Sequence, residues 1–251
     1  MQKQNPQQAH YESIHDAYSA HYYDATSMAY RRRFVFEPLF RGVDLRGKRV
    51  AELACGSGYN SLALREMFPD VNVEGFDLSG QACEDYRRLV GAPAHQVDLT
   101  LPLAEDASFD AAFVIGGLHH CIADLTTVIG NIASLIRPGG IFLLFEPNAR
   151  FALETVRNFW YRKDKYFDAE TEQALDPGKL SQMAAGRFSV ERQFFTGGPA
   201  YFLVLNSLVL RVPQAAKPVI GLPLFAIEAL WNRLPGEAPF AAFGAAWRRL
   251  P

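Results

Sequence analysis

The stretch VAELACGSGYN, residues 50–60, decides how this chain folds. An apolar run with an acid, Glu52, leads into a turn of small residues that contains Gly56 and Gly58, and a helix-like segment, residues 61–68, follows. A buried parallel strand that passes through a glycine turn into a helix is how an open α/β sheet builds a nucleotide site. Because glycine has no Cβ and a helix N-terminus has free N–H groups, we expect a cofactor to bind here.

The glycine spacing differs from the dinucleotide fingerprint G-x-G-x-x-G, because Ser61 stands at the third glycine position. An acid before the glycines suits a cationic sulfonium and would repel a pyrophosphate. The order E-x-A-x-G-x-G resembles motif I of the class I S-adenosylmethionine (SAM)-dependent methyltransferases. In that family the glycine turn lies against the methionine part of the cofactor, so a nicotinamide enzyme is disfavoured.

Two further acids follow in the order that this family shows. The segment 71–79 alternates valines with polar residues and ends at Asp77, and Ser79 is expected to cap the next helix. The resemblance assigns Asp77 to the ribose hydroxyls of the cofactor. The segment 94–99 contains Asp98, which matches the family acid that meets the adenine amino group.

The second half of the expected sheet also has its counterparts in the family. Residues 109–120 form a β-rich run that ends in glycines and then Leu-His-His. Residues 135–140, LIRPGG, resemble the family's helix stop, and a fifth strand is expected at 141–146. The resemblance covers about residues 45–195 and a final strand.

The resemblance implies an α/β fold with a Rossmann-like, seven-stranded, mostly parallel sheet flanked by helices. An N-terminal helical lid is expected at 1–44 and a SAM-binding domain at 45–251, with substrate-side insertions at 147–179 and 197–238, the second of them apolar. The residues expected to bind SAM, and the product S-adenosylhomocysteine (SAH), are Glu52, Ala54, Gly56, Gly58, Asn60, Asp77, Leu78, Asp98, Leu99 and Gly116.

Composition limits the class of protein. The chain has 251 residues, is 49% hydrophobic and carries a net charge of −2, so it can bury a full core and lacks the basic footprint of a nucleic-acid binder. Its three scattered cysteines indicate reduced thiols, and no metal-ligand spacing is visible. Residues 1–8 are polar and unlike a signal peptide, and no apolar run spans a bilayer, so a cytoplasmic location is expected.

Aromatic residues dominate the N-terminal region. Residues 9–41 are expected to form two helices, and AHYYD at 20–24 resembles the lead-in that forms a lid in small-molecule methyltransferases. Most of these aromatics are expected to pack on the sheet, with one or two lining the site. The run Arg31–Arg33 is typical of a solvated helix face, the alternative being one arginine that reaches a carboxylate. Residues 240–249 are expected to form the antiparallel seventh strand or, given their alanines, a short helix.

Candidate catalytic residues are those expected at the carboxyl ends of the fourth and fifth strands, the mouth of an open parallel sheet: His119, His120 and Glu146. Histidine titrates near neutral pH and suits proton abstraction, so His119 is the first choice for a base. The alternatives are that a histidine only packs beside the cofactor and that Glu146 caps the next helix. Asn148 is expected to contact substrate or only to turn the chain after Pro147.

The sequence therefore predicts a SAM-dependent methyltransferase that acts on a small or lipid-linked acceptor, most simply at oxygen. Methylation of nitrogen or carbon of a small metabolite, or a catalytically silent SAM-binding partner subunit, are the alternatives. The absence of D/N-P-P-Y after the fourth strand disfavours nucleobase and glutamine acceptors. Residues 197–238 are read as core helices, as a homodimer surface or as a contact with a membrane surface, and we favour an apolar cover over the acceptor pocket.

Overall fold

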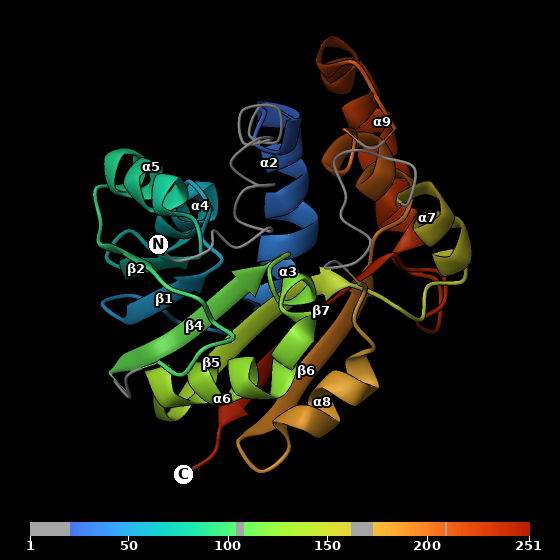
Figure 1. Cartoon of the computed structure of the whole chain (residues 1–251). Helices are drawn as coiled ribbons and strands as arrows, with labels where there is room; N and C mark the ends of the chain where they lie inside the picture. Colours follow the sequence, from blue (N-terminus) through green and yellow to red (C-terminus); the bar gives the residue numbers. More distant parts are fainter. Residues whose placement is uncertain (1–20, 104–107, 162–172, 209) are drawn as a thin grey trace, which may run out of the picture.

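The computed structural model describes residues 21–103, 108–161, 173–208 and 210–251. Within them the chain forms a seven-stranded sheet of order β3-β2-β1-β4-β5-β7-β6 (Figure 1). Only the pairings of β7 are antiparallel among the described strands. The strands are β1 (Arg49–Leu53), β2 (Asn72–Asp77), β3 (Ala94–Gln96), β4 (Phe109–Ile115), β5 (Ile136–Pro147), β6 (Phe188–Thr196) and β7 (Ala242–Arg249). The expected fold class is confirmed.

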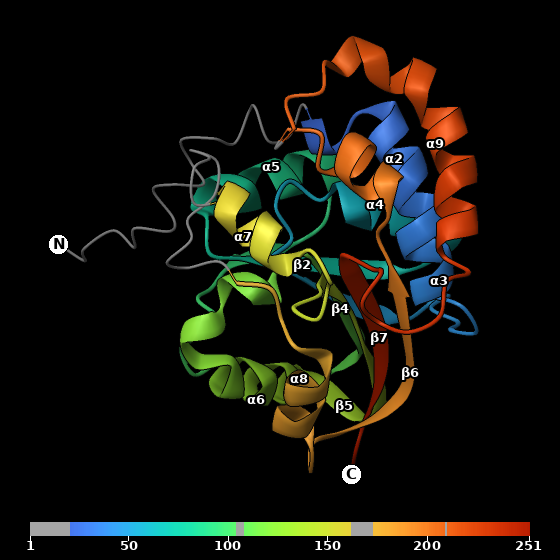
Figure 2. The same cartoon turned by 90° about the vertical axis from the view of Figure 1, so that its right-hand side faces the viewer.

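Helices cover both faces of this sheet (Figure 2). Successive residues of a strand point to opposite faces, and β4 shows both. Phe113 lies in an apolar core with residues of α4 and α5, whereas Val114 lies in a second core with residues of α6 and α8. These flanking helices are α4 (Tyr59–Met67), α5 (Gly80–Val90), α6 (Leu125–Leu135) and α8 (Pro177–Ala184).

The C-terminal segment is a strand and not the alanine-rich helix considered as the alternative. β7 inserts between β5 and β6, where Phe142 faces Trp247 and Phe195 faces Phe243 across the two ladders. Backbone pairing on both sides and burial of Trp247 override the helix propensity of the alanines.

Two strand boundaries differ from expectation. β5 begins at Ile136, so residues 136–140 belong to the strand and the preceding helix α6 stops at Leu135. The pairing with β4 shifts register between Phe109 and Ala111, which accommodates these extra residues. β3 covers only 94–96, and Asp98 lies in the turn that follows it.

The described part of the lid is a continuous helical segment. It comprises α2 (Ala25–Arg31), a π-helical turn (Arg32–Phe36) and α3 (Glu37–Leu39). The side chain of Asp24 caps α2 by accepting the N–H groups of Thr26 and Ser27, at 3.0 and 3.1 Å. The aromatic residues of this segment are buried in the core, as expected, and the first of the two expected helices lies outside the described residues.

The segment 197–238 forms one long helix and two short helical turns. They are the π-helical turn η4 (Tyr201–Leu205), the 3₁₀ turn η5 (Gln214–Ala216) and α9 (Lys217–Trp231). From the sequence alone the prolines of this segment would break it into short pieces, but α9 is one continuous helix. Pro218 lies in the first turn, where its missing N–H has no intrahelical partner. The helix runs on through Pro223, although this residue cannot donate to the Val219 carbonyl.

Buried polar groups fasten α9 to the lid. Lys217 is fully buried, and its Nζ donates to Asp24 Oδ2 at 2.5 Å and to Ser27 Oγ at 2.9 Å. Glu228, also fully buried, accepts from Tyr30 Oη at 2.8 Å. The lid and the insertion are almost 200 residues apart in the chain, but α2 and α9 are neighbours in the fold (Figures 1 and 2). Together they form one cover.

The remaining insertion, 147–179, contains α7 (Glu154–Tyr161) and the start of α8. No helix among the described residues is long and apolar enough to cross a membrane.

Candidate functional site

Three residues of the glycine turn after β1 have a positive φ angle. Ala54, Gly56 and Gly58 have φ angles of +49°, +52° and +89°. A left-handed alanine is strained, and such strain is concentrated at functional sites. The Ala54 methyl packs where a Cβ on Gly117 would lie, 2.6 Å away, so the turn after β1 requires a glycine after β4.

The two glycines of the motif serve different purposes. A Cβ on Gly56 would meet only Tyr23 Oη, at 3.9 Å, so this position faces the space under the lid. A Cβ on Gly58 would lie 2.3 Å from Val90 Cγ2 and 2.7 Å from Tyr86 Cδ2, both on α5. Gly56 therefore faces the candidate ligand space, whereas Gly58 permits the close packing of α4 against α5.

Glu52 is buried at the end of β1. Its Oε1 accepts from Asn60 Nδ2 at 3.2 Å, and its Oε2 accepts a short hydrogen bond from Ser61 Oγ. Ser61 Oγ also lies 2.7 Å from Tyr86 Oη. Burial raises the pKa of the Glu52 carboxyl to about 8, so the acid that was expected to attract the sulfonium is mostly protonated at neutral pH.

Asp77 lies at the end of β2, next to the glycine turn. Its Oδ2 accepts the N–H of Gly56 at 2.8 Å, and its Oδ1 accepts the N–H of Ser79 at 2.9 Å. Ser79 in turn caps α5, as expected, by accepting the N–H of Ala82 at 3.2 Å. The strand order thus brings together Gly56 and Asp77, which were expected to meet the methionine part and the ribose of the cofactor.

The other expected cofactor residues follow the same edge of the sheet. Asp98 Oδ1 accepts from the N–H and the hydroxyl of Thr100, at 2.9 and 2.6 Å, and this turn follows β3. Leu99, which follows Asp98, is buried, and Leu78, which follows Asp77, is half-buried. Gly116, with φ of +70°, lies at the end of β4.

The lid contributes residues that the sequence analysis did not single out. Tyr23 stacks on Tyr59, the first residue of α4, with ring centroids 4.4 Å apart. The guanidinium of Arg31 lies 4.9 Å from the Tyr23 ring centroid and donates to Asn60 Oδ1 at 3.1 Å. The resemblance of residues 20–24 to a lid indicated Tyr23, but only the fold shows which of three consecutive arginines turns inward.

Glu146 at the end of β5 organises the loop after β4. It is fully buried, and its Oε1 accepts the N–H groups of Gly117 and Leu118 at 3.0 and 2.8 Å. Its Oε2 lies 2.7 Å from His119 Nδ1. Glu146 therefore binds the start of the short helix Leu118–His120, which precedes it in the chain, and not the start of the next helix as the alternative to a catalytic role had it. It also orients the imidazole of His119.

The two histidines lie together at this mouth of the sheet. Their ring centroids are 3.8 Å apart, and the His119 side chain is 15% exposed. A Cβ on Gly116 would lie 3.8 Å from His119 Cε1, so the ring of His119 faces the end of β4. His119 thus combines a fixed Nδ1 with partial access to solvent.

Asn148 has a structural position. It is fully buried, and its Nδ2 donates to the carbonyl oxygens of Glu237 and Phe240 at 3.1 and 2.9 Å. The buried guanidinium of Arg157 on α7 donates to the Asn148 carbonyl oxygen at 2.9 Å. Asn148 therefore turns the chain and ties β5 to the segment before β7, in agreement with the simpler of the two expectations.

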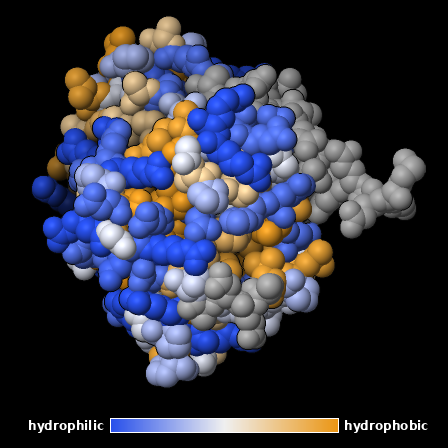
Figure 3. Space-filling view, turned by 90° about the vertical axis from the view of Figure 1, so that its left-hand side faces the viewer, coloured by the Kyte–Doolittle hydropathy of each residue, from blue (hydrophilic) through white to orange (hydrophobic). Residues whose placement is uncertain are grey.

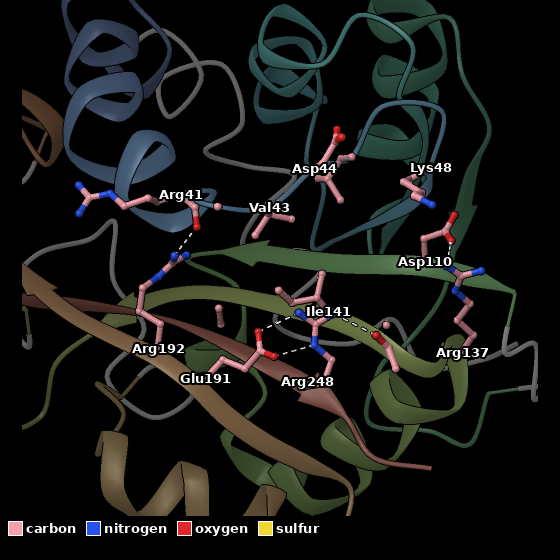
Figure 4. Close-up of a pocket in the computed structure, with 15 residues that line it drawn as sticks. Arg41, Val43, Asp44, Lys48, Asp110, Arg137, Ile141, Glu191, Arg192 and Arg248 are labelled. Atoms are coloured by element: carbon pink, nitrogen blue, oxygen red, sulfur yellow. Dashed lines mark hydrogen bonds and ion pairs between the residues drawn. The ribbon is translucent and has the colours of Figure 1, made fainter.

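A separate cavity of about 520 Å³ lies near the amino-terminal ends of β1 and β4, opposite the glycine turn (Figure 4). Its walls are charged, and two ion pairs join lining residues to each other. Arg248 binds Glu191 at 2.8 Å, and Arg137 binds Asp110 at 2.6 Å. Self-paired charges indicate a structural seam, and in the described residues no group of three or more His, Cys, Asp or Glu side chains could hold a metal ion.

Comparisons with known proteins agree with this geometry. Residues 50–140 match the family model described as a methyltransferase domain. The tRNA U34 carboxymethyltransferase of Trichlorobacter lovleyi is 30% identical over 137 residues, which are 47% of this chain and 41% of that protein. The demethylmenaquinone methyltransferase of Thermus thermophilus is 28% identical over 188 residues, 64% of this chain and 84% of that protein.

Among solved structures, a SAM-dependent methyltransferase from Archaeoglobus fulgidus superposes with a TM-score of 0.60 at 14% identity, covering 93% of this chain and 99% of that one. The chain spans about two-fifths of the length of the first curated relatives that it matches. The chain therefore has the fold of solved SAM-dependent methyltransferases, and its residues 50–140 match a methyltransferase-domain model.

Proposed function

We propose that this protein transfers a methyl group from SAM to a small or lipid-linked acceptor. The observation that carries the proposal is the contact of the Gly56 N–H with the Asp77 carboxylate under Tyr23, at the carboxyl ends of β1 and β2. SAM supplies a methyl group that its sulfonium already activates. The chain has to bind the cofactor, align the acceptor and exclude water, and the cover formed by the lid and α9 suits that task.

Ten residues would hold the cofactor in this proposal. Asp77 would accept hydrogen bonds from ribose hydroxyls, Asp98 would meet the adenine amino group, and Gly56 would let the methionyl part lie close to the backbone. Glu52, Ala54, Gly58 and Asn60 would act by shaping the turn, since their side chains or Cβ directions are engaged within the protein. Leu78, Leu99 and Gly116 would line the adenosyl side.

For an oxygen acceptor, His119 would remove the hydroxyl proton. With Nδ1 held by the Glu146 carboxylate, the neutral imidazole carries its proton on Nδ1 and presents Nε2 as the acceptor of the proton. Glu146 has its oxygens occupied by backbone N–H groups and the imidazole, so we assign it a positioning role in place of contact with the acceptor. His120 would support the ring of His119 by stacking.

A kinetic experiment tests this assignment. In His119→Ala, SAM affinity should stay within about twofold while turnover falls by about 10²- to 10⁴-fold, the usual contribution of a general base. Wild-type turnover should depend on pH, and the variant should lack that dependence. A pH-independent wild-type rate would favour nitrogen or carbon methylation of an acceptor that needs no base, and normal binding without turnover on any acceptor would favour a silent partner subunit.

The acceptor class follows from the cover and its outer surface. Both charged residues of α9, Lys217 and Glu228, point inward, whereas Val219 and Leu222 are 77% and 79% exposed. Arg211 and Arg233 are exposed near the two ends of the helix. An apolar face with cations at its ends fits an anionic lipid surface, so we propose that α9 contacts a membrane from which the acceptor is drawn.

The opposite side of the molecule gives the contrast. On the face seen from the side of α4 and α5, hydrophilic side chains surround an apolar area in the middle (Figure 3). The demethylmenaquinone methyltransferase relative is named for a quinone acceptor, and the carboxymethyltransferase relative for a tRNA. We retain a small or lipid-linked acceptor in place of a nucleic acid because the net charge is −2.

The apolar outer face of α9 has a competing use, which is to form a homodimer.

A further inference from the structure

The turn that follows η4 holds two buried polar side chains whose hydrogen-bonding capacity is not used. Asn206 and Ser207 are 9% and 0% exposed. Among the described residues, Nδ2 of Asn206 and Oγ of Ser207 have no hydrogen-bond partner. A buried polar group without a partner is costly, so each side chain would gain from a ligand atom that supplies the missing bond.

The amide of Asn206 is held in place from two sides. Its Oδ1 accepts from Tyr22 Oη at 3.0 Å, and its backbone N–H donates to the carbonyl oxygen of Tyr201 at 2.8 Å. Because the lid engages Oδ1, the amide keeps Nδ2 as a free donor. Ser207 is the next residue, and its hydroxyl can both donate and accept.

These residues lie at the mouth of the sheet. Tyr23, next to Tyr22 in the lid, approaches the Cβ direction of Gly56 to 3.9 Å. On the other flank, the Phe202 ring of η4 lies 5.8 Å from the ring of Phe151, which follows the end of β5. η4 therefore extends from the lid above the glycine turn to the carboxyl end of β5, the region that an acceptor has to enter.

Charged side chains beside η4 already have partners. The Lys217 ammonium pairs with Asp24, and the Arg157 guanidinium pairs with Glu154 and donates to two carbonyl oxygens. Glu228 accepts two N–H groups of the residues just before η4. The free groups of the turn are an amide and a hydroxyl, so they suit an uncharged oxygen and not a phosphate or a carboxylate.

Aromatic rings accompany the polar groups on η4. Tyr201 and Phe202 meet edge to face with ring centroids 5.3 Å apart, and Phe202 also packs on Phe151. Such rings pack favourably on the flat surface of another ring. The surroundings of Asn206 therefore favour a ligand that combines a ring with an oxygen.

We propose that Asn206 and Ser207 bind an uncharged hydroxyl or carbonyl oxygen of a ring-containing acceptor. This inference rests on the proposed function. The oxygen would accept from Asn206 Nδ2, and Ser207 Oγ would donate to it or, for a hydroxyl, accept from it. An analogue without the oxygen would leave both side chains unpaired, which is how a buried polar site rejects such an analogue.

The test compares three ligands with the same ring system: naphthalene, 2-naphthol and 2-naphthoate. Equilibrium dialysis gives their affinities for protein saturated with SAH, on wild type, Asn206→Asp, Ser207→Ala and the control Asn72→Asp, an exposed position on β2. We expect wild type and the control to bind 2-naphthol about 10-fold more tightly than the other two ligands.

The two variants should lose this preference by removing one partner each. Asn206→Asp keeps an oxygen for Tyr22 and removes the N–H donor, and Ser207→Ala removes the hydroxyl. In each variant, 2-naphthol and naphthalene should bind within about threefold of each other. Ser207→Ala deletes a group that has no partner, so the unfolding midpoint without ligand should stay the same or rise.

The other outcomes overturn the inference. Equal affinity of wild type for 2-naphthol and naphthalene, tighter binding of 2-naphthoate, or binding of none of the three contradicts an uncharged ring oxygen. A preference that survives in both variants, or a Ser207→Ala protein that is less stable with its preference intact, assigns these groups to the fold or to a buried water. If Asn206→Asp does not fold, wild type and Ser207→Ala decide. Wild type that fails to bind SAH in a prior titration would instead remove the proposed function itself.

Discussion

At the scale of single residues, the two glycines of the turn separate folding from binding. A methyl group on Gly58 must displace Val90 and Tyr86 of α5, whereas a methyl group on Gly56 meets only the Tyr23 hydroxyl at 3.9 Å. We therefore expect Gly58→Ala to lower the free energy of unfolding by about 1–3 kcal/mol through overpacking. Gly56→Ala should cost about 1 kcal/mol through its left-handed backbone and should weaken SAH binding more than it weakens the fold.

Denaturant unfolding and SAH calorimetry on both variants check this contrast. If Gly58→Ala kept full stability and lost only binding, Gly58 would instead face the methionine part of the cofactor, as the family resemblance of the glycine turn implies.

The protonation of Glu52 is also testable. Its pKa is raised from the ordinary 4.5 to about 8 by burial, so between these pH values the folded protein holds a proton that the unfolded chain has released. Stability should fall as pH rises through that window, by up to about 1.4 kcal/mol per pH unit. Glu52→Gln retains an oxygen for Asn60 and supplies an N–H to Ser61, so it should abolish this part of the pH dependence.

Unfolding free energies of wild type and Glu52→Gln would be compared from pH 5 to 9. The two curves should converge towards pH 5 and separate towards pH 8, with the variant relatively more stable at high pH. Parallel curves over the whole range would show that Glu52 is not the group that titrates.

Sequence reasoning found the residues with a fixed place in the motif and missed those placed by tertiary packing. Asp77 and Gly56 were predicted because spacing along one βαβ unit brings them together. The inward turn of Arg31 was not, because its burial depends on where the lid helix lies on the sheet. The role of Glu146 was left open for the same reason, since its partners belong to the loop of a neighbouring strand.

At the scale of elements, the pair of Glu146 and His119 joins the end of β5 to the turn after β4. Glu146→Gln can still accept the N–H groups of Gly117 and Leu118 through its amide oxygen, but its NH₂ group would face His119 Nδ1. That arrangement stabilises the other tautomer and removes Nε2 as a proton acceptor. Turnover should fall about as far as in His119→Ala, with SAH affinity preserved. A variant with nearly normal turnover would limit Glu146 to shaping the loop.

A single substitution can remove the hydrogen bonds that hold α9 to the lid. Lys217→Met removes the donor to Asp24 and Ser27 while keeping an apolar side chain of similar length. We expect a loss of about 1–3 kcal/mol, because these acceptors lose a charged partner. Hydrogen exchange should accelerate in α2 and α9 and not in α6. The matched control is Arg233→Met, an exposed position just beyond α9, which should leave exchange unchanged.

Elements were predicted well where periodicity and motif order agreed, and poorly where a local signal stood alone. The terminal strand followed from its place in the family order, although its alanines favour a helix. The prolines of 197–238 pointed to a broken segment, yet α9 is continuous: Pro218 lies in its first turn, and the helix runs on through Pro223. Deleting 199–235 would therefore remove buried core residues such as Phe225, and substitutions on its surface are the better probe.

At the scale of the whole molecule, the apolar outer face of α9 should decide where the protein works. Val219→Glu with Leu222→Glu places charges on the two most exposed positions of that face, so stability should change by less than about 0.5 kcal/mol. Flotation with anionic liposomes should recover wild type and lose the double variant. Met183→Glu, on α8, is the control. Wild type that stays out of the lipid fraction, with a dimer that the double variant breaks, would assign this face to self-association.

The central claim is that the mouth of the sheet at β1 and β2 binds SAM. Isothermal titration of wild type and Asp77→Ala with SAH, and of wild type with NAD, tests it most directly. We expect one SAH per chain, an affinity weakened by about 1–3 kcal/mol in Asp77→Ala and no heat with NAD. Equal SAH affinity in the two proteins would move the cofactor away from Asp77, and binding of NAD in place of SAH would contradict the account.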